Sequence, residues 1–494
     1  MAVTKQYQSN KRWRLSPPPF IAAATIVSVL YIVAGFAFAG EPALSMHREK
    51  KKEDKVILTL EKAIDMALKE NRDITNSEYS AESQRFNIDS ASSIFDLKLI
   101  PVGDVTLNAG DYSDYNYAST GLKLQKKFVY GTSVSVGPRI TRSSRQSIHQ
   151  YTTDMGITIT QPLLRGMGKA FTTDALQTAD AAHKTSLRNL YQTRVNAVLL
   201  TISTFYDAAL QKEMLDLYDK MYSRLKGHSE IARAKEKVGL STPMDTYRVE
   251  ILLNDTEDAM VTALELLQNT KDKLKLILAL PQDTELDIEV TESSGIQIPT
   301  LDEAIETAME NRIEIEQINQ DILEAERKAL VKKQDILPDL NLILNYGRYD
   351  TDDTIEETTG LDSYRYSIGL NISSDISRTA EKAAYQQSLI NIKKLRIDAE
   401  NRKEDIRSQV RSQWLSLQES VKRIEIRNKQ IKQGEEKLAL AEVKFVHGMA
   451  DNFDIIEAEK ELQNARSNLF TARFDYIVGS YNLKAVSGAL VPRN

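Results

Sequence analysis

Acidic side chains follow two glycine-containing turns at matching places in this chain. The turn from Val238 to Asp245 returns as the turn from His447 to Asp454, and Glu457 follows the second one. Asp454 and Glu457 are three residues apart, so on a helix they share one face. Carboxylates held close together favour bound cations and repel one another when no cation or basic partner is present. The alternative interpretation is solvated surface charge on a helix that is already rich in glutamate.

No other set of residues in the sequence has the types and spacing of a catalytic or ligand-binding site. Gly166-Met167-Gly168 lacks the full pattern of a phosphate-binding loop, and we interpret it as a strand-to-helix turn. The chain has no cysteine, which excludes disulfides and thiolate metal sites. The histidines lack the spacing of metal ligands; they are His47, His149, His183, His228 and His447. We therefore expect no enzymatic activity, no catalytic residues, no metal and no cofactor.

The N-terminus is typical of an export signal. Four basic residues and no acidic ones precede an apolar run from Phe20 to Ala39, which ends in Ala37-Phe38-Ala39. This pattern predicts a signal peptide over residues 1–39, and the alternative is an uncleaved membrane anchor. Cleavage removes four positive charges and no negative ones, so the formal charge falls from −6 to −10. An acidic exported protein is a poor partner for nucleic acid.

The chain is internally duplicated. Thr59-Leu60-Glu61-Lys62-Ala63-Ile64 returns as Thr300-Leu301-Asp302-Glu303-Ala304-Ile305, and the two glycine turns return in the same order. The offset between copies is 241 residues at the first pair and 209 at the second, so one copy carries additional residues in its middle. After a polar leader over 40–57, we expect a first structural repeat over 58–298 and a second over 299–494.

Each repeat contains a sequence pattern that predicts very long helices. No proline lies between Pro162 and Pro243, and no glycine lies between Gly168 and Gly227. Apolar residues recur every three or four positions, as in a coiled-coil seam. In the first copy the seam is Leu187, Tyr191, Val195, Val198, Ile202, Phe205, Ala209, Leu210, Met214, Leu217 and Met221, and in the second it is Ile406, Val410, Trp414, Leu417, Val421, Ile424, Ile431 and Leu438. We expect long helices over about 165–280 and about 377–487.

Strands precede the long helices. Four segments of the first copy, 105–109, 121–125, 133–136 and 155–160, alternate in polarity, and so do 341–346 and 367–372 in the second. We expect strands over about 104–161 and about 339–374. No apolar run after the N-terminal one is long enough to cross a bilayer as a helix, so a membrane crossing would need strands. Tyrosines near the strand ends suit a membrane-interface girdle or ordinary β-structure; they are Tyr112, Tyr115, Tyr117, Tyr349 and Tyr364.

This order of elements resembles the TolC-like outer membrane efflux protein family over essentially the whole mature chain. The most specific pieces are Leu58 to Ile64, Gln161-Pro162-Leu163-Leu164-Arg165-Gly166 and the two glycine turns. The chain departs from the family at Ser374-Asp375-Ile376, where a proline is common. It also departs in the first copy, which has more strand-like segments than the two expected.

The resemblance implies a mixed fold, with a trimeric shared transmembrane β-barrel continued by a long α-helical coiled-coil barrel. Four strands from one chain cannot close a barrel, because small closed barrels have about eight strands or more. Several chains must then share one barrel, and the family supplies the number, a homotrimer with twelve strands. The expected location is the outer membrane, with a helical tunnel that extends into the periplasm.

The resemblance implies passive export of small molecules or polypeptide, in tripartite efflux or type I secretion, with a periplasmic adaptor and an inner-membrane pump as partners. The expected adaptor contacts are the turn residues Gly239, Leu240, Ser241, Thr242, Gly448, Met449 and Ala450. A plain interhelical turn, with glycine at positive φ and an N-cap at Thr242 or Asp451, is the alternative. Asp245, Asp454 and Glu457 would form carboxylate rings at an aperture. The rival function is an exported coiled-coil scaffold anchored by an uncleaved N-terminal helix.

Overall fold

A computed structural model describes residues 56–108, 115–145, 148–239, 241–290, 298–447, 449 and 451–493. All of these residues belong to one compact unit. The expected signal peptide and residues 40–55 of the expected leader lie outside the described residues.

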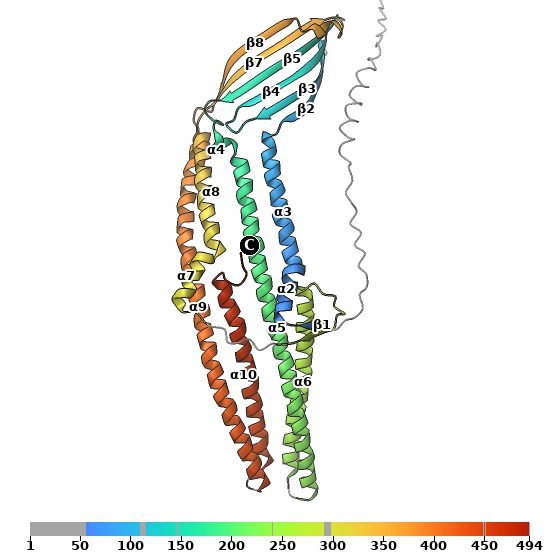
Figure 1. Ribbon diagram of the computed structural model, residues 1–494, viewed down its shortest axis with the longest axis vertical. Coiled ribbons are helices and arrows are strands. Elements are labelled where there is room, and N and C mark those ends of the chain that lie inside the picture. The colour runs from blue at the N-terminus through green and yellow to red at the C-terminus, as the bar shows by residue number, and fades with distance from the viewer. Residues whose placement is uncertain are drawn as a thin grey trace, which may run out of the picture. The chain divides into compact units, whose positions relative to one another are not determined.

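A six-stranded antiparallel sheet gathers strands from both repeats (Figure 1). The first repeat supplies β2 (Lys98–Asn108), β3 (Tyr115–Lys127), β4 (Ser133–Arg145) and β5 (Ile148–Pro162), and the second supplies β7 (Asp339–Asp352) and β8 (Ser363–Ser373). Neighbours in the sheet follow chain order, with β5 of the first repeat beside β7 of the second.

The strand number corrects one expectation. Four strands per chain were implied by the resemblance, and this chain has six in one sheet. The two offsets of the duplication, 241 and 209, differ by 32 residues, which is close to the span of the hairpin from Tyr115 to Arg145. The additional residues of the first copy therefore have the length of one more hairpin, and they enlarge the sheet instead of forming a loop.

Two helical hairpins form the other large part of the fold. The first joins α5 (Asp174–Lys237) to α6 (Pro243–Ile277), and the second joins α9 (Thr379–Val446) to α10 (Asn452–Val486). At 1.5 Å per residue, α5 with 64 residues and α9 with 68 are about 96 and 102 Å long. The shorter partners α6 and α10 both have 35 residues, so the two copies match closely in this part.

The repeated threonine motif marks a helix start in each copy. Thr59 caps α2 (Leu60–Glu70), and Thr300 caps α7 (Leu301–Asn311), where Glu303 completes a capping box. Each of these helices ends at one extended residue, Asn71 or Arg312, after which α3 (Arg72–Ser92) or α8 (Ile313–Asp335) begins.

The predicted seam of α5 forms the main core. Val198, Ile202 and Phe205 are at most 2% exposed, whereas Leu187, also predicted in the seam, is 46% exposed. The core includes residues of α2 and α6 and the parallel pair of β1 (Val56–Leu58) with β6 (Leu286–Ile288). Val56 and Ile57 therefore belong to a strand, within the range expected for the leader. The remaining short elements are η1 (Ser93–Phe95), α4 (Lys169–Thr172) and η2 (Glu357–Gly360).

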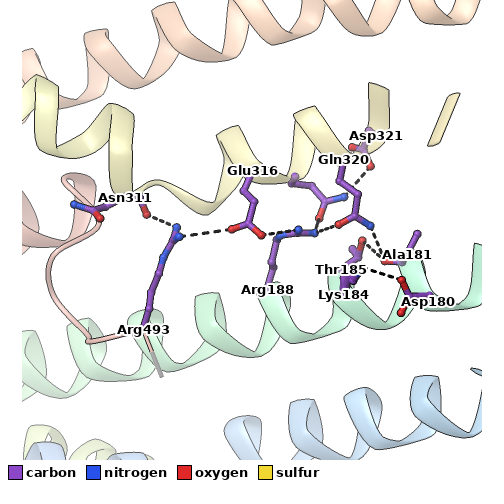
Figure 2. A network of polar contacts seen from close by, with 11 residues as sticks. Asp180, Ala181, Lys184, Thr185, Arg188, Asn311, Glu316, Gln320, Asp321 and Arg493 are labelled. Atoms are coloured by element: carbon purple, nitrogen blue, oxygen red, sulfur yellow. Dashed lines mark hydrogen bonds and ion pairs between the residues drawn. The ribbon is translucent and has the colours of Figure 1, made fainter. Parts of the chain in front are cut away.

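A polar network joins the two repeats between α5 and α8 (Figure 2). Arg188 of α5 lies 2.8 Å from a carboxylate oxygen of Glu316, and it also donates to the side chain of Gln320. Arg493, near the C-terminus, lies 3.6 Å from the other oxygen of Glu316 and donates to the carbonyl of Asn311. These contacts fasten the C-terminal segment to the second repeat, and the hydroxyl of Tyr191 on α5, which donates to the carbonyl of Val491 at 3.0 Å, fastens it to the first. In the part of the chain that is described, no helix combines the length and apolar character needed to cross a membrane.

Candidate functional site

The first glycine turn is a tight connection whose backbone requires glycine. Gly239 has φ of 75°, in the left-handed region, and its N–H donates to the carbonyl of Glu236 at 3.0 Å. Pro243 occupies the first helical position of α6 after the N-cap Thr242. The side chain of Thr246 on α6 donates to Glu236 of α5 at 2.6 Å, so the two helices are bonded across the turn.

The second turn uses a similar arrangement with different residues. The N–H of Met449 donates to the carbonyl of Lys444 at 2.8 Å. Asp451 is the N-cap of α10, and its carboxylate accepts from the N–H groups of Phe453 at 2.9 Å and Asp454 at 3.2 Å. Three of the expected contact residues, Leu240, Gly448 and Ala450, lie outside the described residues.

The structure brings the two turns side by side, although about 200 residues separate them in sequence. The ammonium of Lys235, at the end of α5, lies 3.5 Å from the ring centre of Phe445 at the end of α9. The guanidinium of Arg248 on α6 lies 5.1 Å from the ring centre of Phe453 on α10. These two cation–π contacts link one hairpin to the other at the end that carries both turns (Figure 1).

Large apolar side chains are exposed around these turns. We name them the tip patch, and they are Val238, Met244, Tyr247, Met449 and Phe453, exposed by 45 to 70%. Single exposed apolar residues are common on protein surfaces, but a group of this kind on one end is typical of an interaction site. Apart from Met449, the sequence analysis missed this patch. These residues lie outside the seams, and their shared surface appears only when the two turns are adjacent.

The carboxylates near the turns have different surroundings. Asp245 accepts from the N–H of Thr242 at 3.1 Å, from its hydroxyl at 2.7 Å and from the hydroxyl of Ser241 at 3.1 Å. The hydroxyl and N–H of Thr242 lower the pKa of Asp245 below its ordinary value, because they stabilise the charged form. Its carboxylate is therefore committed to capping α6.

Asp454 and Glu457 are both exposed on one face of α10. The carboxylate of Glu457 lies 3.7 Å from the ammonium of Lys437 on α9. Lys437 also binds Glu461 at 2.9 Å, and that hydrogen bond is the main cause of its raised pKa. Sequence reasoning missed Lys437, because its partners are on another helix. Among the three predicted aperture residues, Asp454 and Glu457 are the exposed ones, and Glu457 already has Lys437 as a partner.

The capping role of Asp245 gives a pH-dependent prediction. Its pKa is lower in the folded protein than in the unfolded chain, so its stabilising effect is complete above the ordinary aspartate pKa of about 3.9 and is lost as pH falls through the lower value. We expect Asp245→Ala to cost about 1 kcal/mol of local stability at pH 7, roughly a fivefold loss of amide protection in the first turn of α6. Hydrogen exchange measures this, and the loss should shrink at pH values below the folded pKa.

Asp255→Ala is the matched control, because Asp255 is exposed in the interior of the same helix. Equal protection in the first turn of α6 for Asp245→Ala and Asp255→Ala at pH 7 would contradict the capping role.

The six-stranded sheet has two chemically different faces. One cross-strand row, which we name the apolar row, takes one apolar or aromatic residue from every strand: Leu99, Leu124, Val136, Ile157, Tyr346 and Tyr366. A neighbouring row on the opposite face, the polar row, takes one polar residue from every strand: Lys98, Gln125, Ser135, Thr158, Asn345 and Ser367. Such alternation is typical of strands with lipid on one side and water on the other.

Part of the polar row is hydrogen-bonded across strands. The hydroxyl of Thr158 donates to the side-chain oxygen of Asn345 at 2.8 Å, and the amide of Asn345 donates to the hydroxyl of Ser367 at 3.1 Å. Within the described residues, no group of three or more histidine, aspartate or glutamate side chains is placed to hold a metal ion.

Comparison with known proteins agrees with this architecture. Residues 304–489 match the family described as outer membrane efflux protein. A search of curated protein sequences finds no match. Solved structures with the same fold include the outer-membrane channel OprN, with a TM-score of 0.69 and 12% identity over 92% of this chain and 97% of that one.

Two further channels are similar. The CmeC outer membrane channel of Campylobacter jejuni has a TM-score of 0.67 and 14% identity over 92% of this chain and 94% of that one. The open state of the MtrE outer membrane channel of Neisseria gonorrhoeae has 0.65 and 13%, over 92% and 98%. Residues 304–489 therefore match the outer membrane efflux protein family, and the whole chain, with its two-faced sheet and paired long helices, has the fold of the outer-membrane channels OprN, CmeC and MtrE.

Proposed function

We propose that three copies of this chain share one closed barrel and form a passive duct through the outer membrane. The sheet carries the proposal, because its two faces differ and because the outer edges of its two edge strands, β2 and β8, have no pairing strand within the described chain. An unpaired strand edge in lipid leaves backbone amides and carbonyls without partners, at several kcal/mol each. Pairing β2 of one copy with β8 of the next removes both edges and closes a ring by cyclic symmetry.

The helical hairpins continue this duct as a tunnel through the periplasm. The seams bury one stripe of each long helix within the protomer, and exposed apolar residues such as Leu200 and Leu264 are available to neighbouring copies. The duct has no energy source of its own in this proposal. An inner-membrane pump drives transport, and the cargo is small molecules in efflux or polypeptide in type I secretion.

The decisive experiment is the detergent-corrected mass of protein extracted from isolated outer membranes without cross-linking. A mass near three chains, with residues 1–39 absent, is the expected result. A monomer or dimer recovered from the inner membrane with its N-terminus intact would replace the duct by the anchored coiled-coil scaffold.

The tip patch is the proposed docking surface for the periplasmic adaptor. It lies at the two turns, and it combines exposed apolar side chains with tight turns. A charge placed in this patch must be desolvated on docking, so Met449→Asp is expected to weaken adaptor binding about tenfold, or roughly 1.4 kcal/mol. Accumulation of an efflux dye in cells that depend on this channel reports the loss.

Met167→Asp is the matched control for docking, since Met167 is also exposed but lies at the strand-to-helix junction. Equal dye accumulation in both variants, with trimer mass unchanged, would exclude the tip patch as the docking surface.

Asp454 and Glu457 are the proposed aperture carboxylates, and threefold symmetry would repeat each of them around the axis. Asp245 is a weaker candidate, because its carboxylate already caps α6. Removing the charge from an aperture ring should reduce the local affinity for cations. Asp454→Ala is therefore expected to raise the conductance in planar bilayers or weaken block by divalent cations. Asp454→Glu keeps the charge and should behave as the unmodified channel, and no change in either property for Asp454→Ala would remove the aperture assignment.

A further inference from the structure

We propose that all six strands of each protomer belong to the barrel wall, so that the trimer encloses an eighteen-stranded pore. The inference rests on the proposed trimeric duct and concerns the width of that duct. The alternative is a narrower wall of four strands per chain, with one hairpin held outside it.

The first argument is the chemistry of the strands. A hairpin outside the wall would not need one apolar face and one polar face in phase with the others. The apolar row and the polar row both run through all six strands without a break. On β2, the outermost strand, Leu99 and Leu107 on the apolar face are 65 and 76% exposed, and on β8 Ile368 is 75% exposed. Both edge strands therefore present lipid-type surface.

The second argument is the match between the sheet and the helices that join it. The helices α3, α5, α8 and α9 lead into or out of the strands, α3 through η1 and α5 through α4, and they pack in that order as a row (Figure 1). At about 9 Å between axes, four helices span roughly 36 Å. Six strands spaced about 4.8 Å apart and tilted by about 40° span roughly 38 Å, whereas four would span roughly 25 Å. Six strands fit above four helices without a gap.

The same dimensions describe the closed ring. Three copies of six strands give eighteen strands and a barrel about 36 Å in backbone diameter, whereas twelve strands would give about 24 Å. Side chains on the inner face take up about 5 Å on each side, which leaves a bore of roughly 26 Å instead of roughly 14 Å. An α-helix with its side chains is about 10–12 Å wide, so the wider pore passes cargo with helical structure as well as extended chains and small molecules.

The register across the copies follows from the sheet. The polar row begins at Lys98, the first residue of β2, and reaches β8 at Ser367, six residues before that strand ends at Ser373. The row therefore climbs away from the helical end by about six residues across one protomer. Continued into the next copy, it meets β2 six to eight residues along that strand, near Thr106.

Cysteine pairs test this contact directly, because the natural chain has no cysteine. Thr106→Cys combined with Arg365→Cys or Ser367→Cys places thiols on the polar face of β2 and β8. The expected result is disulfide-linked protomers on a non-reducing gel, since facing Cα atoms of antiparallel strands, about 4.5 or 5.5 Å apart, lie within the Cα range of a disulfide. The matched control replaces Thr106→Cys by Thr141→Cys, which lies eight residues along β4. If the hairpin of β2 and β3 were outside the wall, β4 would be the edge strand that meets β8 of the next copy, and this control pair would form the link.

Each outcome is decisive. Disulfide links from the pairs with Thr106→Cys, and none from the pairs with Thr141→Cys, support the six-strand wall. Links from Thr141→Cys, or no links from either position in a protein of trimeric mass, overturn it and leave the duct itself intact. A protein that is not trimeric would instead contradict the proposed function.

A second variant tests the bore. Replacing residues 109–147 by Asn-Gly removes β3 and β4 and joins β2 to β5 with both faces kept in phase. In each protein, Thr158→Cys on the polar face is labelled from outside the cell with maleimide polymers of graded size. The largest polymer admitted is expected to fall in diameter about twofold in the shortened variant, from the bores derived above. An unchanged size limit would overturn the wide pore, and if the variant does not assemble, the disulfide pairs decide.

Discussion

Ile368→Arg is expected to abolish recovery of the protein from the outer membrane. Ile368 is the central residue of β8 and lies on the apolar face, beside Leu344 of β7. An arginine at the middle of the lipid-facing band costs about 2–4 kcal/mol in each copy. In water the same change would cost little, because the side chain is 75% exposed and fills no cavity. The amount of protein in the outer membrane fraction measures the effect.

Ser367→Arg is the matched control, one residue away on the opposite face. It removes one hydrogen bond from Asn345 but places the charge toward the water-filled side. The protein should then remain in the outer membrane at close to the unmodified level. If both arginine variants are recovered equally, the assignment of the two faces to lipid and water is wrong.

Phe205→Ala is expected to have the largest effect on the helical part. Phe205 is 1% exposed, and its ring packs edge-on against Tyr206 with 5.4 Å between ring centres. The surrounding core joins α5 to α2, α6 and the β1–β6 pair. Removal of a buried aromatic ring costs about 3–5 kcal/mol, because the lost contacts are not replaced and a cavity remains. Proteolysis of the detergent-solubilised protein after urea treatment should show a lower urea midpoint.

Phe86→Ala makes the same change on α3 at a side chain that is 55% exposed, and it should lower the urea midpoint much less. A midpoint for Phe205→Ala no lower than that for Phe86→Ala would show that this cluster does not hold the helices together.

The sequence alone determined the elements that depend on local patterns. Seam residues such as Val198 and Ile202 are buried as their spacing predicted, because a helix repeats its faces every 3.6 residues. Segments with alternating polarity, such as 155–160, lie within strands that have two different faces. The alternative interpretation of the first turn, an interhelical turn with glycine at positive φ, agrees with the backbone of Gly239. Each of these properties requires only a residue and its neighbours in the chain.

Only the tertiary structure decided which distant elements meet. The tip patch exists because the ends of the two hairpins meet, as the contact of Arg248 in the first repeat with Phe453 in the second shows. Asp245 looked equivalent to Asp454, but its contacts with Thr242 and Ser241 commit it to a helix cap. The sequence predicted strands in both copies, and their pairing into one sheet of six followed from long-range hydrogen bonds between β5 and β7. The paired residues of β5 and β7 are about 190 positions apart in the sequence, and no local pattern specifies which distant strands will pair.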